Sequence, residues 1–191
     1  MANSKLIVVE GAQGAGKTTY TDYIRYSLSY TNLYRLSGTS DSTVSGLEKA
    51  KSMYERLLDY VEDLENKSIN LVFDRTFFTE EVYCRLGKKA YSFTEVYNNL
   101  LERFSKLDFE IFYITLYLEN KSVFEQRLQR DGKAVFLGSK FGVENSVSQQ
   151  LEYLKMADEI KQKYPNINVT NIKTDRLQSD VEKELREKIG Y

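Results

Sequence analysis

The residues best suited to chemistry form one continuous run, Gly-Ala-Gln-Gly-Ala-Gly-Lys-Thr, at positions 11–18. This run fits the phosphate-binding pattern GxxxxGK[ST], and it stands between an apolar stretch, Leu6 to Val9, and a segment of helical character. Glycines let the backbone approach an anion, so that N–H groups and the start of the next helix point at a phosphate. Lys17 supplies a positive charge for the β- and γ-phosphates, and the hydroxyl of Thr18 can bind Mg²⁺. We therefore predict a nucleotide phosphate site, with Lys17 catalytic, formed by Gly11, Ala12, Gln13, Gly14, Ala15, Gly16, Lys17, Thr18 and Thr19.

A second candidate, Asp74-Arg75, follows the apolar run 70–73. An aspartate at the end of a buried strand, downstream of a phosphate-binding loop, is typical of a Mg²⁺ site. The planar guanidinium of Arg75 suits phosphoryl oxygens. Taken alone, the pair would be read as an ordinary surface ion pair. In this context we predict that Asp74 and Arg75 are catalytic and that Thr18 and Asp74 are the metal ligands.

A third group of charges consists of Arg127, Arg130 and Lys133. The two arginines are three residues apart and share one helix face, and Lys133 follows the expected end of that helix. The segment after it is rich in glycine and polar residues. These cations can form a catalytic lid over the phosphates, at about residues 127–145, or they can be a solvated basic face.

Composition bounds the class of protein. The chain has 191 residues, 41% apolar and 29% charged, with a net charge of −1, which predicts one globular domain over residues 1–191. No histidine is present, so histidine catalysis and histidine-ligated metal sites are excluded. The single cysteine, Cys84, cannot form an internal disulfide. With no signal peptide and no apolar stretch long enough to cross a bilayer, we expect a cytoplasmic protein without membrane contact.

Apolar runs alternate with helical patterns along the chain, which predicts an α/β fold with a parallel sheet. Strands are expected at 5–10, 33–36, 69–73, 109–118 and 167–172. Helices are expected at 17–30, 47–64, 93–104, 122–130, 147–164 and 179–189. Ser92, Ser122 and Ser179 are each followed by a glutamate three residues later, so we expect them to cap the helices that end at 104, 130 and 189. Ligands of such sheets bind at the carboxyl ends of the strands. The loose segments 37–46 and 132–145 are therefore candidate ligand loops.

Together these stretches resemble the thymidylate kinase and deoxynucleoside kinase branch of the P-loop nucleotide kinases. The matching residues are 7–19, Phe73-Asp74-Arg75 with Thr79 and Tyr83, Tyr117-Leu118-Glu119 through Arg127, Arg130 and Lys133, and 167–189. The resemblance implies a three-layer fold, with a five-stranded parallel sheet in the order 2-3-1-4-5, helices on both faces and a lid after strand four. It also implies Mg·ATP as donor, a nucleoside or nucleoside monophosphate as acceptor, and a homodimer. On matching positions it implies that Asp74 serves Mg²⁺, that Arg75 binds the acceptor or the transferring phosphate, and that Arg127 and Arg130 belong to the lid.

The acceptor region departs from this family. Gln13 stands where thymidylate kinases usually carry an acid, and their Arg-Glu-Pro-Gly-Gly-Thr stretch is reduced here to residues 35–39. The catalytic acid that deoxynucleoside kinases carry in this region is absent, and Asp41 is the nearest carboxylate. Aromatic residues that could stack on an acceptor base, or simply be core, are Tyr54, Phe77, Phe78 and Tyr83.

The sequence allows three alternatives to a small-molecule kinase to be compared. A kinase acting on a hydroxymethyl-type base within DNA is compatible with the unusual acceptor region, although the acidic isoelectric point of about 5.8 disfavours DNA as a partner. A non-catalytic nucleotide-binding module is compatible with the missing acid. A GTPase is rejected, because Asn66-Lys67 and Asn120-Lys121 both lack the aspartate that completes the guanine-reading motif.

Overall fold

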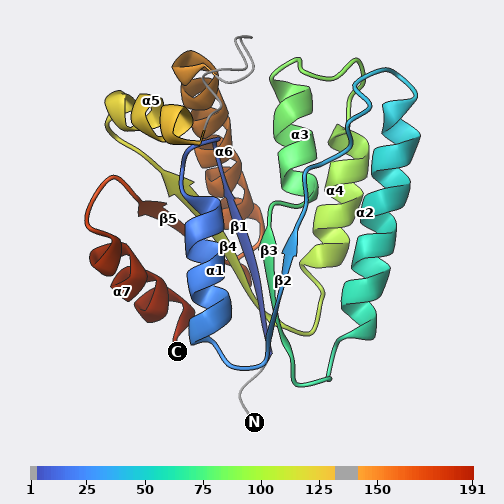
Figure 1. Cartoon of the computed structure of the whole chain (residues 1–191). Helices are drawn as coiled ribbons and strands as arrows, with labels where there is room; N and C mark the ends of the chain where they lie inside the picture. Colours follow the sequence, from blue (N-terminus) through green and yellow to red (C-terminus); the bar gives the residue numbers. More distant parts are fainter. Residues whose placement is uncertain (1–3, 132–141) are drawn as a thin grey trace.

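The computed structural model describes residues 4–131 and 142–191. Its centre is one five-stranded parallel sheet with the strand order β2-β3-β1-β4-β5, as predicted (Figure 1). The strands are β1 (Lys5–Gly11), β2 (Thr31–Arg35), β3 (Asn70–Asp74), β4 (Glu110–Tyr117) and β5 (Asn168–Lys173). Each strand boundary lies within two residues of its expected position.

Helices cover both faces of the sheet (Figure 1). Because side chains alternate along a strand, Ile7 and Val9 of β1 point to one face and Leu6 and Val8 to the other. The first pair packs in a core with α1 (Lys17–Ser27) and α7 (Gln178–Ile189). The second pair packs in a larger core with α2 (Gly46–Asp63), α3 (Phe77–Arg85), α4 (Thr94–Phe104) and α6 (Val143–Lys163). The remaining helix, α5 (Lys121–Arg130), follows β4 at the carboxyl edge of the sheet.

The strand register brings the predicted functional residues to one edge. Val9 of β1 lies opposite Asp74 of β3, and Arg35 of β2 lies opposite Asp74 on its other side. Gly11 at the end of β1 lies opposite Leu116 of β4. The P-loop, Asp74 and Arg35 therefore share the carboxyl edge of the sheet, where ligands of open α/β sheets bind.

Helix starts differ from those expected. At α4, Ser92 does not cap the helix, which begins at Thr94 without a side-chain cap. At α5 the cap is Asn120, whose side chain accepts a hydrogen bond from the N–H of Ser122 (3.0 Å). At α7 the residue before the helix is Leu177, and Ser179 lies within the first turn. Serine–glutamate spacing alone thus misplaced the caps, because the preceding turn decides which residue enters the helix.

Helix α3 was not expected, and α6 is longer than expected. The first six residues of α3 are buried, so the helix lacks the polar stripe by which sequence periodicity is recognised. Helix α6 begins at Val143 and so includes the last part of the predicted lid. Residues 127–131 of the predicted lid are described, whereas its middle part, residues 132–141 with Lys133, lies outside the described residues. Within the described part of the chain, no helix combines the length and apolar character needed to cross a membrane.

Candidate functional site

The P-loop has the backbone geometry of an anion cradle. Gly11, Gly14 and Gly16 all adopt positive φ values, 146°, 83° and 96°, that side chains disfavour. A Cβ on Gly11 would lie 2.6 Å from the carbonyl oxygen of Leu116, so only glycine fits there. Lys17 is 6% exposed, and its Nζ donates to the carbonyl oxygens of Gly11 (2.7 Å) and Ala12 (2.8 Å). The lysine is thus held at the loop that would wrap the phosphates.

The predicted metal ligands lie side by side. Thr18 is in the first turn of α1, and its Oγ1 is 3.4 Å from Oδ2 of Asp74 at the end of β3. Asp74 is 6% exposed. No cluster of three or more His, Cys, Asp or Glu side chains that could hold a metal ion exists among the described residues. A hydroxyl and one carboxylate nevertheless fit Mg²⁺, which usually takes only one or two carboxylates and completes its shell with phosphates and water.

Arg75 adopts a strained backbone conformation next to the P-loop. Its φ is +72°, a left-handed value that is uncommon for a residue with a side chain. Its N–H donates to the carbonyl oxygen of Val9 (3.2 Å), which joins the turn after β3 to β1. Among the described residues, the half-buried guanidinium of Arg75 has no hydrogen-bond or ion-pair partner. A guanidinium that is partly removed from water and has no partner gains from pairing with an anion, so this side chain is suited to binding one.

Glu10 is a buried acid that the sequence reasoning did not assign to the site. It is completely buried, and it accepts hydrogen bonds from the N–H of Thr76 (2.8 Å) and from Oγ1 of Thr79 (2.7 Å). The same Thr79 hydroxyl lies 2.8 Å from the hydroxyl of Tyr153 on α6. Burial raises the pKa of Glu10 to about 7, although the hydrogen bonds from Thr79 and Thr76 lower it. The sequence feature that could have identified Glu10 is its position, because it is a carboxylate in an apolar strand directly before the P-loop.

Arg127 and Arg130, the two arginines predicted to belong to a lid, lie in different surroundings. Arg127 donates to the carbonyl oxygen of Gly14 (2.9 Å) and to that of Thr174 in the loop after β5 (2.7 Å). The hydroxyl of Thr174 in turn donates to the carbonyl oxygen of Ala15 (2.7 Å). Arg127 therefore holds the backbone of the P-loop, both directly and through Thr174. Arg130 has a 70% exposed side chain, pairs with Asp131 (3.0 Å) and faces the cavity in front of the loop.

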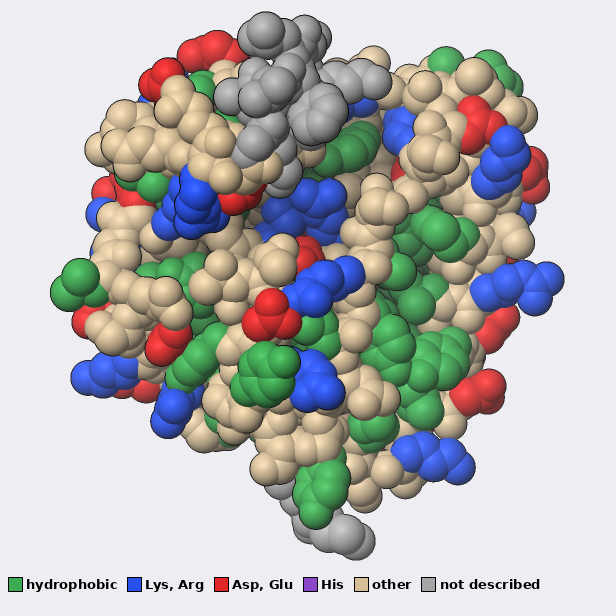
Figure 2. Space-filling model, in the orientation of Figure 1, with side chains coloured by type: hydrophobic (Ala, Val, Ile, Leu, Met, Phe, Trp, Pro, Cys, Tyr) green, Lys and Arg blue, Asp and Glu red, His purple; other side chains and the backbone are tan. Residues whose placement is uncertain are grey.

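One cavity of about 250 Å³ collects most of the predicted residues. Figure 2 shows basic side chains gathered in a hollow on this face of the molecule. The predicted catalytic and metal residues that line it are Lys17, Thr18, Asp74, Arg75 and Arg130. Three lining residues were not assigned from the sequence: Arg35 at the end of β2, Leu36 directly after it, and Asp131 directly after α5. Arg127 is not among the lining residues.

Comparison with solved structures identifies the fold. A thymidylate kinase from Candida albicans superposes with a TM-score of 0.67 at 17% identity, over 98% of this chain and 91% of that protein. A deoxyadenosine kinase from M. mycoides with bound dCTP gives a TM-score of 0.62 at 18% identity, over 96% and 97% of the two chains. The same kinase with bound dATP gives 0.61 at 17% identity, over 95% and 97%. No protein-family model matches the chain, and neither does any curated protein sequence.

The chain has the fold of the thymidylate and deoxynucleoside kinases. This confirms the fold, the strand order and, at the level of fold, the resemblance drawn from the motifs.

A buried polar network attaches the loop after β2 to α3. Glu80 on α3 is 1% exposed and accepts from the hydroxyl of Tyr91 (2.6 Å) and from the N–H of Thr39 in the loop after β2 (3.0 Å). Lys89 lies 3.1 Å from Glu80 and donates to the carbonyl oxygen of Thr39 (2.6 Å). The loop after β2, which includes the reduced family motif at residues 35–39, is therefore attached to α3. Asp41 in this loop accepts from Thr43, Ser45 and Lys49 and forms a turn.

Most candidate stacking aromatics belong to the core of the kinase fold. Tyr54, Phe77 and Phe78 are at most 1% exposed and stack on one another or on neighbouring rings. Tyr83 is half-buried. Tyr54, Phe77 and Phe78 are therefore core residues, which is one of the two interpretations that the sequence allows.

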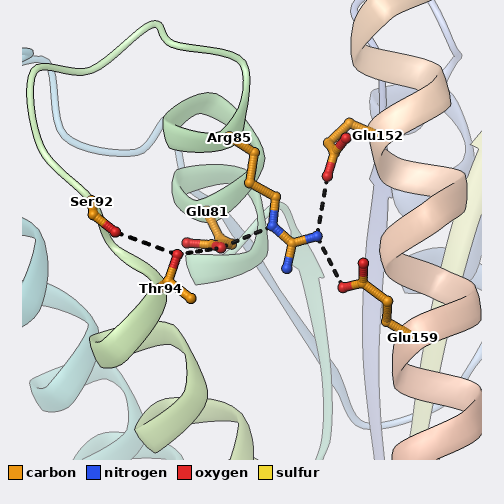
Figure 3. Close-up of polar contacts among 6 residues, drawn as sticks. All are labelled: Glu81, Arg85, Ser92, Thr94, Glu152 and Glu159. Carbon is orange, nitrogen blue, oxygen red and sulfur yellow. Dashed lines mark hydrogen bonds and ion pairs between the residues drawn. The ribbon is translucent and has the colours of Figure 1, made fainter.

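An ion cluster joins α3 to α6 (Figure 3). Arg85 on α3 donates to Glu81 (2.8 Å), Glu152 (3.1 Å) and Glu159 (2.9 Å), and the last two belong to α6. Glu81 also accepts from the hydroxyl of Thr94 at the start of α4 (3.0 Å). The cluster fixes α3, which directly follows the Asp74-Arg75 turn, against the long helix α6.

Helix α6 also contacts the P-loop. Oε1 of Gln149 accepts a hydrogen bond from the N–H of Gln13 in the P-loop (3.3 Å). The side-chain amide of Gln150 pairs with both backbone groups of Leu118 just after β4 (2.7 and 2.8 Å). The P-loop, the end of β4 and α3 are thus all held by one helix.

Proposed function

We propose that this chain is an ATP- and Mg²⁺-dependent kinase that transfers the γ-phosphate to a deoxynucleoside or to a (deoxy)nucleoside monophosphate. The observation that carries the proposal is the cavity in which Lys17, the Thr18–Asp74 pair and the guanidinium of Arg75 meet. The fold supports it, because proteins of this fold include kinases of nucleotides and of deoxynucleosides.

Each residue has a separable role in this reaction. The P-loop N–H groups and Lys17 would bind the β- and γ-phosphates and orient the terminal one. Thr18 and Asp74 would hold Mg²⁺, which when bound neutralises charge on the phosphate oxygens. Arg75 would stabilise the charge on the transferring group or the acceptor. Such fixed charges contribute on the order of a few kcal/mol each to transition-state stabilisation.

Lid residues would complete the site. Arg130 at the end of α5 faces the cavity and would approach the phosphates when they are bound. Arg127 would act on the donor side through the P-loop, since its guanidinium already holds the carbonyl of Gly14. Exclusion of water from the phosphates would strengthen each of these charge interactions.

The test is an ADP-release assay with ATP, Mg²⁺ and a panel of acceptors. The panel contains the common nucleosides, deoxynucleosides and their monophosphates, and DNA with hydroxymethylated pyrimidines. We expect ADP release that depends on a small-molecule acceptor and is abolished by EDTA and by Lys17→Ala. Release with DNA alone would support the DNA-kinase alternative. Binding of ATP without turnover on any acceptor would show a non-catalytic module.

A further inference from the structure

One face of α6 contacts two separate segments near the cavity. Gln149 and Tyr153 are four residues apart, so their side chains are neighbours on that face of the helix. Gln149 accepts a hydrogen bond from the N–H of Gln13 in the P-loop, and Tyr153 bonds Thr79 on α3. Both side chains are at most 2% exposed, so the packing around them limits their movement. A single stretch of helix therefore links the P-loop to the segment that follows Arg75.

A chain of hydrogen bonds runs from Tyr153 to the turn that carries Arg75. The Tyr153 hydroxyl lies 2.8 Å from Oγ1 of Thr79, which donates to Oε2 of Glu10 (2.7 Å). A threonine hydroxyl has one proton, and Thr79 gives it to Glu10, so Tyr153 is the donor to Thr79. Oε1 of Glu10 accepts from the N–H of Thr76 (2.8 Å), the residue directly after Arg75. The bonded residues are each at most 3% exposed, so bulk water does not replace a bond that is lost.

This chain is costly for the fold, and it holds a strained residue. Complete burial removes Glu10 from water, and the rise of the Glu10 pKa to about 7 reflects that cost. Arg75 has a φ of +72°, a conformation that persists only where the surrounding contacts impose it. Two of those contacts are the bond from the Arg75 N–H to Val9 and the bond from the Thr76 N–H to Glu10. The network thus helps to determine where the guanidinium of Arg75 lies relative to the P-loop.

We propose that Tyr153 is a positioning residue for Arg75 and acts through Thr79 and Glu10; this rests on the proposed kinase function, in which Arg75 acts on a phosphate. Without the Tyr153 hydroxyl, Thr79 would lose the donor that orients it toward Glu10. The turn after β3 would then be held less firmly, and Arg75 would be displaced in part of the molecules. A displacement of about 1 Å can cost on the order of 100-fold in rate. The P-loop would stay in place, because Gln149 still bonds it.

The variant Tyr153→Phe removes the hydroxyl and keeps the ring. In the ADP-release assay with the best acceptor, we expect kcat to fall about tenfold or more, with the calorimetric Kd for ATP within about twofold of the parent value. The matched control is Tyr164→Phe, which removes the hydroxyl of a buried tyrosine just after α6 that bonds Glu102 instead, and it should change neither quantity. An unchanged kcat in folded Tyr153→Phe would refute the inference.

Substitutions of Thr79 test the middle of the chain. Thr79→Ser keeps the hydroxyl and should retain most of the parent kcat, whereas Thr79→Val keeps the size and should lower kcat at least as much as Tyr153→Phe. Equal kcat values for Thr79→Ser and Thr79→Val would show that the hydroxyl does not transmit the effect, and would refute this route.

A double variant distinguishes positioning from a general loss of structure. If Tyr153 acts through Arg75, then adding Tyr153→Phe to a chain that already carries Arg75→Met should lower kcat by less than about twofold. If Tyr153→Phe lowers kcat by the same factor with and without Arg75, the two residues act independently and the inference is overturned.

Hydrogen exchange gives a readout that needs no turnover. The amides of residues 74–79 should exchange faster in Tyr153→Phe than in the parent chain, while those of residues 11–18 exchange at the parent rate. Equal exchange at 74–79 would overturn the positioning role whatever the activity. A parent chain without acceptor-dependent ADP release would instead overturn the kinase function and the catalytic part of this inference, and faster exchange at 74–79 would then still show that Tyr153 holds the turn.

Discussion

The N–H of Thr76 donates a 2.8 Å hydrogen bond to Oε1 of Glu10, so a buried acid of β1 holds the residue that follows Arg75. The N–H of Arg75 itself bonds to the carbonyl oxygen of Val9. The turn is therefore fixed on both sides of Arg75, whose left-handed backbone costs on the order of 1–3 kcal/mol. Strain at this position is maintained because β1, which also begins the P-loop, holds the turn in place.

Glu10→Gln should change how stability depends on pH. Because the pKa of Glu10 is raised to about 7 in the folded chain, its contribution to stability is complete below its ordinary value of 4.5 and is lost as pH rises through 7. Glutamine keeps an acceptor for Thr76 and carries no charge. The unfolding free energy of Glu10→Gln minus that of the parent chain should therefore increase by up to about 3 kcal/mol between pH 4.5 and 7.

Urea unfolding at several pH values measures this difference, with the exposed Glu48→Gln on α2 as the matched control. A difference between Glu10→Gln and the parent chain that is constant across this pH window would contradict the prediction.

Lys17→Ala should abolish phosphoryl transfer while the fold survives. The hydrogen bonds of this side chain described above are to backbone carbonyls of the P-loop, and its ammonium would supply the charge at the β- and γ-phosphates. We expect a loss in kcat of at least 100-fold, in line with other fixed charges that act on a transition state. Circular dichroism and thermal unfolding confirm folding. Near-normal turnover by the folded variant would refute the role of Lys17.

The Thr18–Asp74 pair should control the metal requirement. Thr18→Val and Asp74→Asn each remove one oxygen ligand that suits Mg²⁺, so the Mg²⁺ concentration for half-maximal activity should rise at least several-fold in both. Thr18→Ser keeps the hydroxyl and is the matched control. Metal titration of ADP release gives the comparison, and identical midpoints in all four proteins would show that the pair is not a metal site.

The fold and the meeting of the P-loop with Asp74 could be predicted because their signals are local. The P-loop pattern requires a strand before it and a helix after it, and apolar alternation then orders the rest of the sheet. Asp74 follows from the same logic, because it ends an apolar strand. These signals need no knowledge of which residues become neighbours in space.

The other side of the cavity, around the loop after β2, depends on contacts between distant segments. Nothing near Thr39 in the sequence indicates that it bonds Glu80, 41 residues later. Arg35 was visible only as the remnant of a family motif, and its place beside Asp74 comes from the register of β2 and β3. Arg127 shares a helix face with Arg130 but turns to the P-loop backbone, which spacing on one helix does not reveal.

The two lid arginines should have different kinetic effects. Arg130→Ala should lower kcat more than it weakens ATP binding, because Arg130 faces the cavity and pairs with Asp131 rather than with the P-loop. Arg127→Ala should weaken ATP binding as well, because it removes the hydrogen bonds that hold Gly14 and Thr174. Calorimetric ATP binding and steady-state kinetics separate the two. If both variants behave like the parent chain, neither arginine contributes to catalysis or to ATP binding.

Lys89→Met should destabilise the protein and loosen the loop after β2, residues 36–45. The Lys89 side chain is 6% exposed and its partner Glu80 is 1% exposed, so removing the ammonium leaves a buried carboxylate without its counter-charge. Breaking such a pair from one side costs about 3–5 kcal/mol. Because Thr39 bonds both members of the pair, hydrogen exchange should also rise in residues 37–45.

The double variant Glu80→Gln with Lys89→Met tests the cause. It removes both charges, and the glutamine side chain would keep an acceptor for Tyr91 and Thr39, so most of the lost stability should return. Unfolding free energies of the two single variants and the double variant give the coupling between the residues. Additive losses, with no recovery in the double variant, would mean that Lys89 stabilises the loop through its bond to Thr39 alone and that the buried charge pair contributes nothing.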